Sequence, residues 1–240
     1  MNIFPLSEGT FTVDNSKIFV PFDEKKGKLI SRLAGSLLVE IQPFAVITSK
    51  DILLLDTGLG LSDEMGVLQL HHNLLFAGIN PSSVTKVLLT HLHKDHAGGA
   101  VKLSFPGARY YLQQRELDYA VENGLPSFVP EELEVLRNSS QVVLLKNDTG
   151  IIDDYIHFEV TGAHSPWHQV FWIKENNETV FFGGDDAPHL MQMKHRYIAK
   201  YDYNGKKAAL LRQQWRNQGE KEEWNFLFYH DAKNPVWKFK

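Results

Sequence analysis

The chain has 240 residues, of which 43% are hydrophobic and 22% are charged, with a formal net charge of −4 and no cysteine. A chain of this length can bury a core without disulfide staples, so we expect one domain spanning residues 1–240. The absence of cysteine excludes disulfides, thiolate nucleophiles and cysteine-based metal sites. No long basic stretch is present, and we interpret the short run Lys25-Lys26 with Lys28 as a solvated loop, so nucleic acid is not expected as a partner.

The N-terminal segment MNIFPLSEGT lacks the positive start and the long apolar run of a signal peptide. The apolar runs elsewhere are far too short to span a bilayer. We therefore expect a cytoplasmic protein without membrane contact. Its oligomeric state is left open, with a homodimer as one alternative.

The first part of the chain has the residue pattern of strands. Short apolar runs are bounded by turn residues, as strands usually are. The segment 49–51 suits a hairpin turn, and Thr57-Gly58-Leu59-Gly60 ends the strand that follows it. The strands predicted here cover residues 9–13, 36–41, 44–48 and 52–56.

Helices and strands alternate in the remainder of the chain. Helices are predicted at residues 68–77, at 113–123, from Pro130 onward and within 190–215. Strands are predicted at residues 86–90, 141–145, 155–161, 169–174 and 179–182, and in the aromatic-rich segments 224–229 and 236–239. Because strands precede, surround and follow the helices, this order supports a layered mixed α/β domain, and two sheets sandwiched between helices would accommodate it.

The most informative stretch is Thr90-His91-Leu92-His93-Lys94-Asp95-His96-Ala97-Gly98-Gly99, which directly follows the predicted strand 86–90. Neutral imidazoles together with a carboxylate suit zinc and related divalent ions. In extended geometry His91 and His93 point the same way, whereas Asp95 and His96 lie beyond them and can serve a second ion. The two glycines that end the stretch allow the backbone to turn tightly beside the site. The spacing therefore predicts a metal site at a strand end.

This stretch resembles the metal-binding signature of the metallo-β-lactamase superfamily. Asp56-Thr57-Gly58, at the end of an earlier predicted strand, resembles that family's early motif. Three further motifs follow in the family's order, namely residues 161–168 around His164, residues 181–185 ending at Asp185, and residues 228–231 around His230. The resemblance runs from about residue 36 to the end, and it implies an α+β fold, the four-layer αββα sandwich of that superfamily.

The resemblance also implies two divalent metal ions, with zinc as the first expectation and manganese, iron or cobalt as alternatives. Seven residues are implied as ligands, with His91, His93 and His164 on one ion, Asp95, His96 and His230 on the other, and Asp185 bridging both. Asp56 would orient a ligand by hydrogen bonding.

Asp185 and Asp186 compete for the bridging position. Family members often carry Gly-Asp, then Pro three residues after that Asp, then Tyr-Asp further on. Gly184-Asp185, Pro188 and Tyr201-Asp202 fit this pattern without a gap. We therefore assign the bridge to Asp185 and a turn or supporting role to Asp186.

The chemistry implied by such a site is hydrolysis. Two ions about 3.5–4 Å apart can hold a shared water and lower its pKa toward neutrality. The resemblance thus implies a hydrolase that uses a metal-bridging hydroxide to open a small-molecule lactone or related ester, with Asp95 as the catalytic proton carrier. No side-chain nucleophile is required, which agrees with a chain that lacks cysteine and a Gly-x-Ser-x-Gly motif.

Within the superfamily the chain is most similar to the lactonase-like group, which includes N-acyl homoserine lactone hydrolases. Residues 164–169 and 228–231 carry this similarity, whereas Trp167 stands in place of a usual glycine and Pro188 in place of a frequent tyrosine. The alternatives on the same fold are a phosphotriesterase, a thioester hydrolase and a β-lactamase. A mononuclear iron dioxygenase and a metal-binding protein without turnover also stay open.

Other polar residues receive weaker interpretations. His168, four residues after His164, could support a ligand, face the substrate or simply be hydrogen bonded. His189 and Gln192 either line the site or begin a helix. The remaining histidines weighed here are expected at the surface or satisfied in the core, namely His71, His72, His157 and His195.

Overall fold

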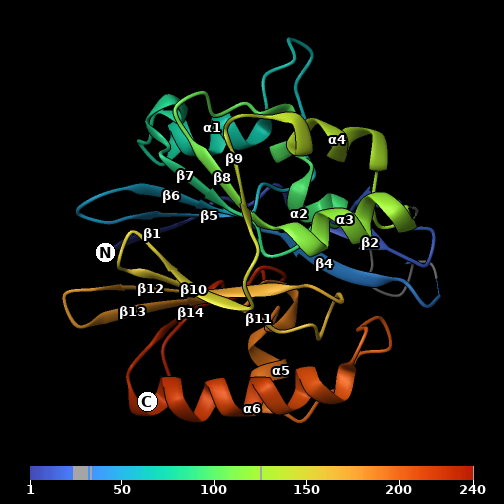
Figure 1. Cartoon of the computed structure of the whole chain (residues 1–240). Coiled ribbons are helices and arrows are strands. Elements are labelled where there is room, and N and C mark those ends of the chain that lie inside the picture. The colour runs from blue at the N-terminus through green and yellow to red at the C-terminus, as the bar shows by residue number, and fades with distance from the viewer. Residues whose placement is uncertain (24–31, 33, 125, 240) are drawn as a thin grey trace.

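The computed structural model describes residues 1–23, 32, 34–124 and 126–239, so the lysine run at 25–28 lies outside the described residues. Four layers are stacked, with helices outside and two sheets inside (Figure 1). This confirms the predicted αββα sandwich. No helix in the described part of the chain is both long enough and apolar enough to cross a bilayer.

The first sheet has six strands, and its outer face is covered by helices α1 (Gln69–Phe76), α3 (Gln114–Asn123) and α4 (Pro130–Asn138). Its parallel part runs from β6 to β9, and the strands β1 and β5 before it pair antiparallel. In spatial order the strands are β1 (Asn2–Pro5), β5 (Phe44–Ile47), β6 (Ile52–Leu55), β7 (Lys86–Leu88), β8 (Arg109–Gln113) and β9 (Val142–Leu145).

The second sheet also has six strands, and helices α5 (Leu190–Lys194) and α6 (Gly205–Lys221) cover its outer face. It is antiparallel except for the parallel pair β13 and β14. In spatial order the strands are β10 (Thr149–Ile152), β11 (Ile156–Val160), β12 (Gln169–Glu175), β13 (Glu178–Phe182), β14 (Asn225–Leu227) and β15 (Val236–Trp237).

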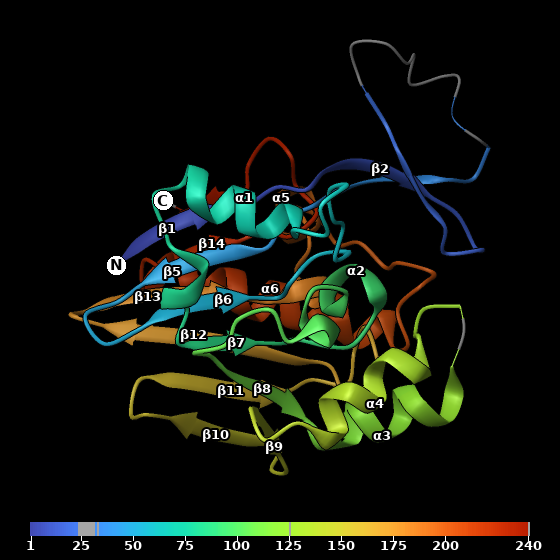
Figure 2. The ribbon, with the colours of Figure 1, turned by 90° about the horizontal axis from the view of Figure 1, so that it is seen from above.

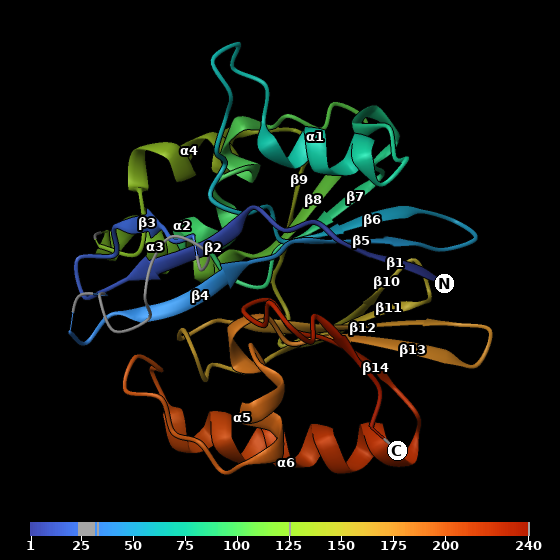
Figure 3. The same ribbon diagram turned by 180° about the vertical axis from the view of Figure 1, so that it is seen from behind.

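A third, smaller sheet has the order β3 (Phe19–Pro21), β2 (Gly9–Val13) and β4 (Leu37–Ile41). Seen from above and from behind, it lies at the end of the sandwich where the short helix α2 (Lys94–Ala97) is found, away from the two chain termini (Figures 2 and 3). The hairpin of β2 and β3 therefore stands beside the loops that follow the strands of the first sheet.

Strand periodicity explains why the first sheet is apolar on both faces. Successive side chains of a strand point to opposite faces. In β6, Leu54 packs under the helices, whereas Leu53 and Leu55 pack between the two sheets against residues such as Phe171 and Phe182. A strand that is buried on both faces needs a continuous apolar run, which is why residues 52–55 read Ile-Leu-Leu-Leu.

Most predicted elements are present, and several short strands were missed. The segment 190–215 holds two helices, α5 and the beginning of α6, instead of one. The aromatic-rich C-terminus lies in the core, as predicted, because Trp224, Phe226 and Phe228 are buried. The strands without a prediction are β1, β3, β8 and β10. Three of the four have five residues or fewer and lie at a sheet edge, and β8 runs directly into α3, where a helix was predicted from residue 113.

Candidate metal centre

Parallel strands carry the seven predicted ligands to one end of the sandwich. Strands β6 and β7 are parallel, so the Asp56 segment and the His91 segment leave the first sheet at the same edge. Strands β13 and β14 are parallel in the second sheet, and they lead to Asp185 and His230. The carboxyl ends of parallel strands share one edge of a sheet, which is a general position for functional groups. His164 joins them from the loop after β11.

Three imidazoles form the first group of converging side chains. His91 Nε2 lies 3.0 Å from His93 Nδ1, and His164 Nε2 lies 3.1 Å from the same nitrogen. Their candidate ligand atoms and that of Asp185 all lie within 4.8 Å of one another. The predicted first ligand group is therefore brought together by the fold.

The second group consists of Asp95, His96 and His230, whose candidate ligand atoms also lie within 4.8 Å of one another. Asp95 Oδ2 is 3.7 Å from His96 Nε2 and 3.8 Å from His230 Nε2. The short helix α2 places Asp95 and His96, while the loop after β14 supplies His230.

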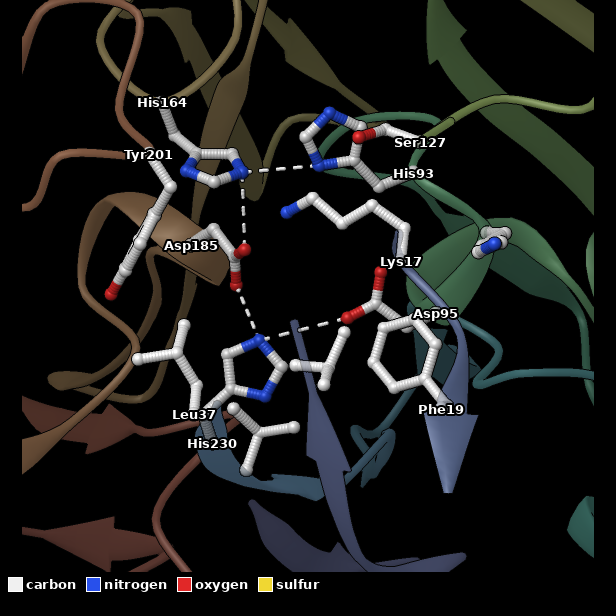
Figure 4. Close-up of a pocket in the computed structure, with 13 residues that line it drawn as sticks. Lys17, Phe19, Leu37, His93, Asp95, Ser127, His164, Asp185, Tyr201 and His230 are labelled. Carbon is white, nitrogen blue, oxygen red and sulfur yellow. Dashed lines mark hydrogen bonds and ion pairs between the residues drawn. The ribbon is translucent and has the colours of Figure 1, made fainter. Parts of the chain in front are cut away.

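Asp185 stands between the two groups and turns one carboxylate oxygen toward each (Figure 4). Its Oδ2 lies 3.1 Å from His164 Nε2. Its Oδ1 lies 2.9 Å from His230 Nε2 and 3.1 Å from His96 Nε2. Asp186, by contrast, is fully buried behind the site, where it accepts hydrogen bonds from the His164 backbone N–H at 2.7 Å and from the Thr161 hydroxyl. Asp185 therefore lies between the two groups and Asp186 lies behind them, and the assignment of Asp185 as the bridging ligand stays a prediction.

The donor set fits a divalent metal cofactor. Zinc–nitrogen bonds of about 2.0–2.1 Å put two nitrogens of a tetrahedral shell roughly 3.3 Å apart. The 3.0 and 3.1 Å separations around His93 Nδ1 are close to that value. In addition, His96 Nε2 and Asp185 Oδ1 are buried and lie 3.1 Å apart, but neither makes a well-directed hydrogen bond within the described residues. Buried polar atoms normally have a partner, and a metal ion is the partner that imidazole and carboxylate share.

Burial lowers the pKa of His91 and His93, whereas at Asp185, His96 and His230 burial is outweighed by neighbouring opposite charge, which lowers the pKa of Asp185 and raises the pKa of His96 and His230. Burial, followed by repulsion from His96, holds the pKa of His91 well below its ordinary value. Burial and then His164 do the same to the pKa of His93. Neutral imidazoles have the free ring nitrogen that a metal requires. Burial opposes ionisation of Asp185, yet the surrounding histidines, His230 first, hold its pKa well below the ordinary range.

Asp56 organises the end of the first sheet. Its Oδ2 lies 2.7 Å from His96 Nδ1, and its Oδ1 accepts a 2.8 Å hydrogen bond from the Thr90 backbone N–H. The Thr90 hydroxyl donates to Asp56 Oδ2 at 2.8 Å and lies 3.0 Å from His91 Nδ1. One carboxylate thus contacts a histidine of one candidate ligand group directly and a histidine of the other through Thr90. Asp56 does so from a left-handed backbone conformation, with φ at 53°.

A second set of buried polar groups supports His164. Asp202 Oδ1 lies 3.0 Å from His164 Nδ1, and the Arg212 guanidinium lies 3.3 Å from Asp202 Oδ2. Arg212 Nε also donates to the Asp186 carbonyl at 2.6 Å. His168 is fully buried with Nδ1 3.0 Å from Asp186 Oδ2, so it acts as a buried partner of Asp186 and does not face the cleft.

The second ligand group has its own supports. His230 Nδ1 lies 2.6 Å from the Glu40 carbonyl oxygen, which fixes the ring with Nε2 toward Asp185. The Tyr229 hydroxyl donates to the Asp95 carbonyl at 2.6 Å, and its ring stacks on His96 with centroids 4.0 Å apart. Four of the five candidate histidine ligands therefore have a partner on their second nitrogen, and the ring of His93 packs against Phe128 with centroids 4.9 Å apart.

The site opens into a cleft with about 500 Å³ of space, its mouth included. One side is apolar, and the other side carries ligand residues together with lysines and a hydroxyl (Figure 4). Its lining beyond the ligands consists of Val13, Lys17, Phe19, Leu37, Val39, Lys94, Ser127 and Tyr201. The sequence did not predict these residues, because most come from the small sheet and its turn, which lie far from the ligand motifs along the chain. Only Tyr201 had a signal, as part of the Tyr-Asp pair after Pro188.

The residues given weaker interpretations lie mostly outside this cleft. His189 caps α5, with Nδ1 accepting from the Met191 backbone N–H at 3.1 Å, which fits the helix-start interpretation. Gln192 donates to the Tyr201 hydroxyl at 3.3 Å. His72 pairs with Asp63 at 2.8 Å on the surface. The other three are His71, whose ring meets that of Phe105 edge to face, the partly exposed His157, and the exposed His195 at the end of α5.

Solved structures of other proteins resemble this fold over nearly its whole length. A probable metal-dependent hydrolase from Staphylococcus aureus superposes with a TM-score of 0.76 at 19% identity, covering 99% of this chain and 91% of the other. AidC, a dizinc quorum-quenching lactonase in complex with a homoserine product, gives a TM-score of 0.73 at 20% identity, covering 98% and 88%. An N-acyl homoserine lactone hydrolase with its product at the catalytic metal centre gives 0.68 at 19%, covering 96% and 93%.

No curated protein matches the chain in sequence. The family model of the metallo-beta-lactamase superfamily matches residues 41–186, which is more than half of the chain. That range holds the strand ends of the first sheet, the histidine cluster, His164 and Asp185. The chain therefore belongs to the metallo-β-lactamase superfamily.

Proposed function

We propose that the protein is a dinuclear metal-dependent hydrolase that opens a lactone or a related ester. The observation that carries this proposal is the position of Asp185, whose two carboxylate oxygens face two different groups of histidines at 2.9–3.1 Å. A carboxylate placed in this way suits a bridge between two ions. The seven ligands of the proposal are those predicted from the sequence, and zinc is the first candidate metal.

Bound ions would supply Lewis-acid activation of a water and of the substrate's carbonyl oxygen. The protein's own groups do the rest. Asp185 and the imidazoles hold the site, and their buried partners fix the orientation of each ring. Asp95 lies in the cleft with Oδ2 directed between His96 and His230, where it can take the proton of the attacking water and pass it to the leaving alkoxide.

The lactone assignment rests on the cleft and on the resemblance. An apolar wall made of Phe19, Leu37 and Val39 faces the ligand residues and suits an acyl chain beside the reacting ester. Two of the structural relatives are a quorum-quenching lactonase and an N-acyl homoserine lactone hydrolase. Tyr201 brings a phenol to the same cleft, whereas Pro188 offers none at the position where lactonases often have tyrosine.

We also propose that residues 1–240 act as one domain, since the helical layers and sheets share continuous apolar packing. Cytoplasmic location and a homodimer stay predictions.

The proposal is tested by hydrolysis of N-hexanoyl homoserine lactone with zinc-loaded protein. We expect turnover in the wild type and a loss of at least roughly 100-fold in His93→Ala, together with a loss of bound metal. The matched control is His72→Ala, which removes a histidine that pairs with Asp63 at the surface and should leave both quantities unchanged. Full activity in His93→Ala would refute the site.

The same protein preparation separates the alternatives. Metal-loaded wild type that leaves lactones intact but cleaves a phosphotriester, a thioester or a β-lactam would change the proposed substrate class. It would leave the proposed metal site in place. A single bound iron with oxygen consumption would favour the dioxygenase. A full metal load without turnover on any of these substrates would favour a metal-binding protein.

A further inference from the structure

Lys17 reaches the metal cleft from a segment that contributes no ligand. It ends the tight turn between β2 and β3, where its backbone N–H donates to the Asp14 carbonyl at 3.0 Å. The Ser16 backbone N–H and hydroxyl both donate to Asp14 Oδ1, at 2.9 and 2.5 Å. Lys17 itself has a left-handed backbone with φ at 57°, which is uncommon for a residue other than glycine. The turn thus fixes the direction in which the side chain of Lys17 leaves the backbone.

That direction is into the cleft. Lys17 lines it together with His93 and Asp185, and Figure 4 shows its extended side chain among the ligand residues instead of in open solvent. Within the described part of the chain the Lys17 ammonium has no hydrogen bond and no ion pair. The ammonium is therefore available to a molecule in the cleft.

The charge of the site makes this position informative. The net charge considered next is that of the proposed dinuclear site, on which this inference rests. Two divalent ions would carry four positive charges, the ligand carboxylates Asp95 and Asp185 would balance two of them and a bridging hydroxide a third, and neutral imidazoles would balance none, so one positive charge would remain. A lysine beside a centre that is already positive is repelled, and Lys94 lines the same cleft. A negatively charged group on the bound substrate would be attracted to the Lys17 ammonium and would offset this repulsion.

The rest of the lining describes the remainder of such a substrate. Phe19 and Leu37 line the same cleft with apolar surface, and Ser127 offers a hydroxyl beside His93. We propose that Lys17 is a specificity-determining residue that binds an anionic group on the acyl portion of the substrate. The preferred substrate class is then a lactone or ester whose acyl chain is short, partly apolar and ends in a carboxylate.

The test compares two lactones that differ at the end of the acyl chain, N-succinyl homoserine lactone with a carboxylate and N-pentanoyl homoserine lactone without one. The proteins are zinc-loaded wild type, Lys17→Met, Lys17→Arg and the control Lys146→Met, which changes an exposed lysine in the turn after β9. We expect wild type to favour the succinyl lactone in kcat/KM. Lys17→Met should reduce that preference roughly tenfold, mostly through KM, and leave the pentanoyl lactone nearly unchanged. Lys17→Arg should restore the preference.

A binding measurement keeps the inference independent of turnover. Calorimetric titration with the ring-opened product N-succinyl-homoserine should show roughly tenfold weaker binding to Lys17→Met than to wild type, Lys17→Arg or Lys146→Met. Lys17-dependent binding without hydrolysis of either lactone would refute the proposed lactonase function and support the Lys17 inference. Hydrolysis with an unchanged preference in Lys17→Met, or equal product binding by all four proteins, would overturn the inference and leave the function in place.

Discussion

His96 Nδ1 lies 2.7 Å from Asp56 Oδ2, and both side chains are completely buried. This contact fixes the imidazole so that Nε2 faces Asp185, 3.1 Å away. The same carboxylate holds Thr90, whose hydroxyl reaches His91. Asp56, which belongs to neither candidate ligand group, thereby helps to orient a histidine in each of them. Supporting carboxylates have this role in metal sites.

Replacing Asp56 should weaken metal binding more than it changes the fold. Asp56→Asn keeps the size of the side chain but removes the charge that orients His96, so we expect a 10–100-fold loss of zinc affinity. Competition with a chromogenic chelator measures it. Asp63→Asn is the matched control, because Asp63 holds His72 at 2.8 Å on the surface. Equal affinity in Asp56→Asn and Asp63→Asn would contradict the orienting role.

The turn after β6 should tolerate a methyl group at one glycine and reject it at another. Both Gly60 and Gly66 have left-handed backbones, at φ 71° and 80°. A Cβ on Gly60 would lie 2.3 Å from the Gly98 carbonyl oxygen, whereas a Cβ on Gly66 meets nothing within 4 Å. We expect Gly66→Ala to cost about 1–2 kcal/mol and Gly60→Ala roughly 2–5 kcal/mol. Urea unfolding measures the free energy of unfolding of both variants. Equal losses would show that the close packing of Gly60 against Gly98 does not contribute to stability.

The sequence predicted the site better than its surroundings, for a physical reason. His91, His93, Asp95 and His96 are adjacent in the chain, so their spacing alone carries the ligand pattern. Lys17 has no such signal, because a lysine in a surface turn has the same local sequence whether it faces solvent or a cleft. Its placement is decided by how the small sheet packs against the sandwich.

The sequence also could not predict which polar side chains pair with one another inside the core. His168 was left with several interpretations, and only the fold shows its Nδ1 3.0 Å from Asp186. The region predicted as helical within 190–215 is interrupted between α5 and α6, because the intervening loop carries Asp202 to His164. Tertiary contacts of this kind override local helix propensity.

Glu8 should make stability depend on pH. Burial raises its pKa from 4.5 to about 7, and the hydrogen bond from the Leu59 backbone N–H only partly opposes this. Below about pH 4.5 both folded and unfolded states hold the proton, so the group contributes nothing. Between about 4.5 and 7 only the folded state keeps it, so stability falls as pH rises, by about 3 kcal/mol in all.

The measurement for Glu8 is urea unfolding at pH 5 and pH 8 for the wild type and Glu8→Gln. Glutamine can still accept the Leu59 hydrogen bond and cannot ionise, so the variant should lose less stability between the two pH values. It should therefore be the more stable protein at pH 8. The same pH dependence in both proteins would contradict a buried, proton-retaining Glu8.

Arg212 should be costly to remove because it is buried and holds two site aspartates together. It donates to the Asp186 carbonyl at 2.6 Å and lies 3.3 Å from Asp202 Oδ2. Arg212→Met leaves Asp202 without its cation, and we expect a loss of about 3–5 kcal/mol of unfolding free energy. Arg137→Met, which breaks a surface pair with Asp118, should cost at most about 1 kcal/mol. Comparable losses in the two variants would contradict a structural role for Arg212.

The central claim is a site for two ions that share Asp185, and metal content per chain tests it most directly. Mass spectrometry of zinc-supplied, desalted wild type, His93→Ala and His230→Ala gives the numbers, since each variant removes one ligand from a different group. We predict about two ions in the wild type and about one in each variant. A single ion in the wild type, or two ions retained in both variants, would contradict the two-ion site.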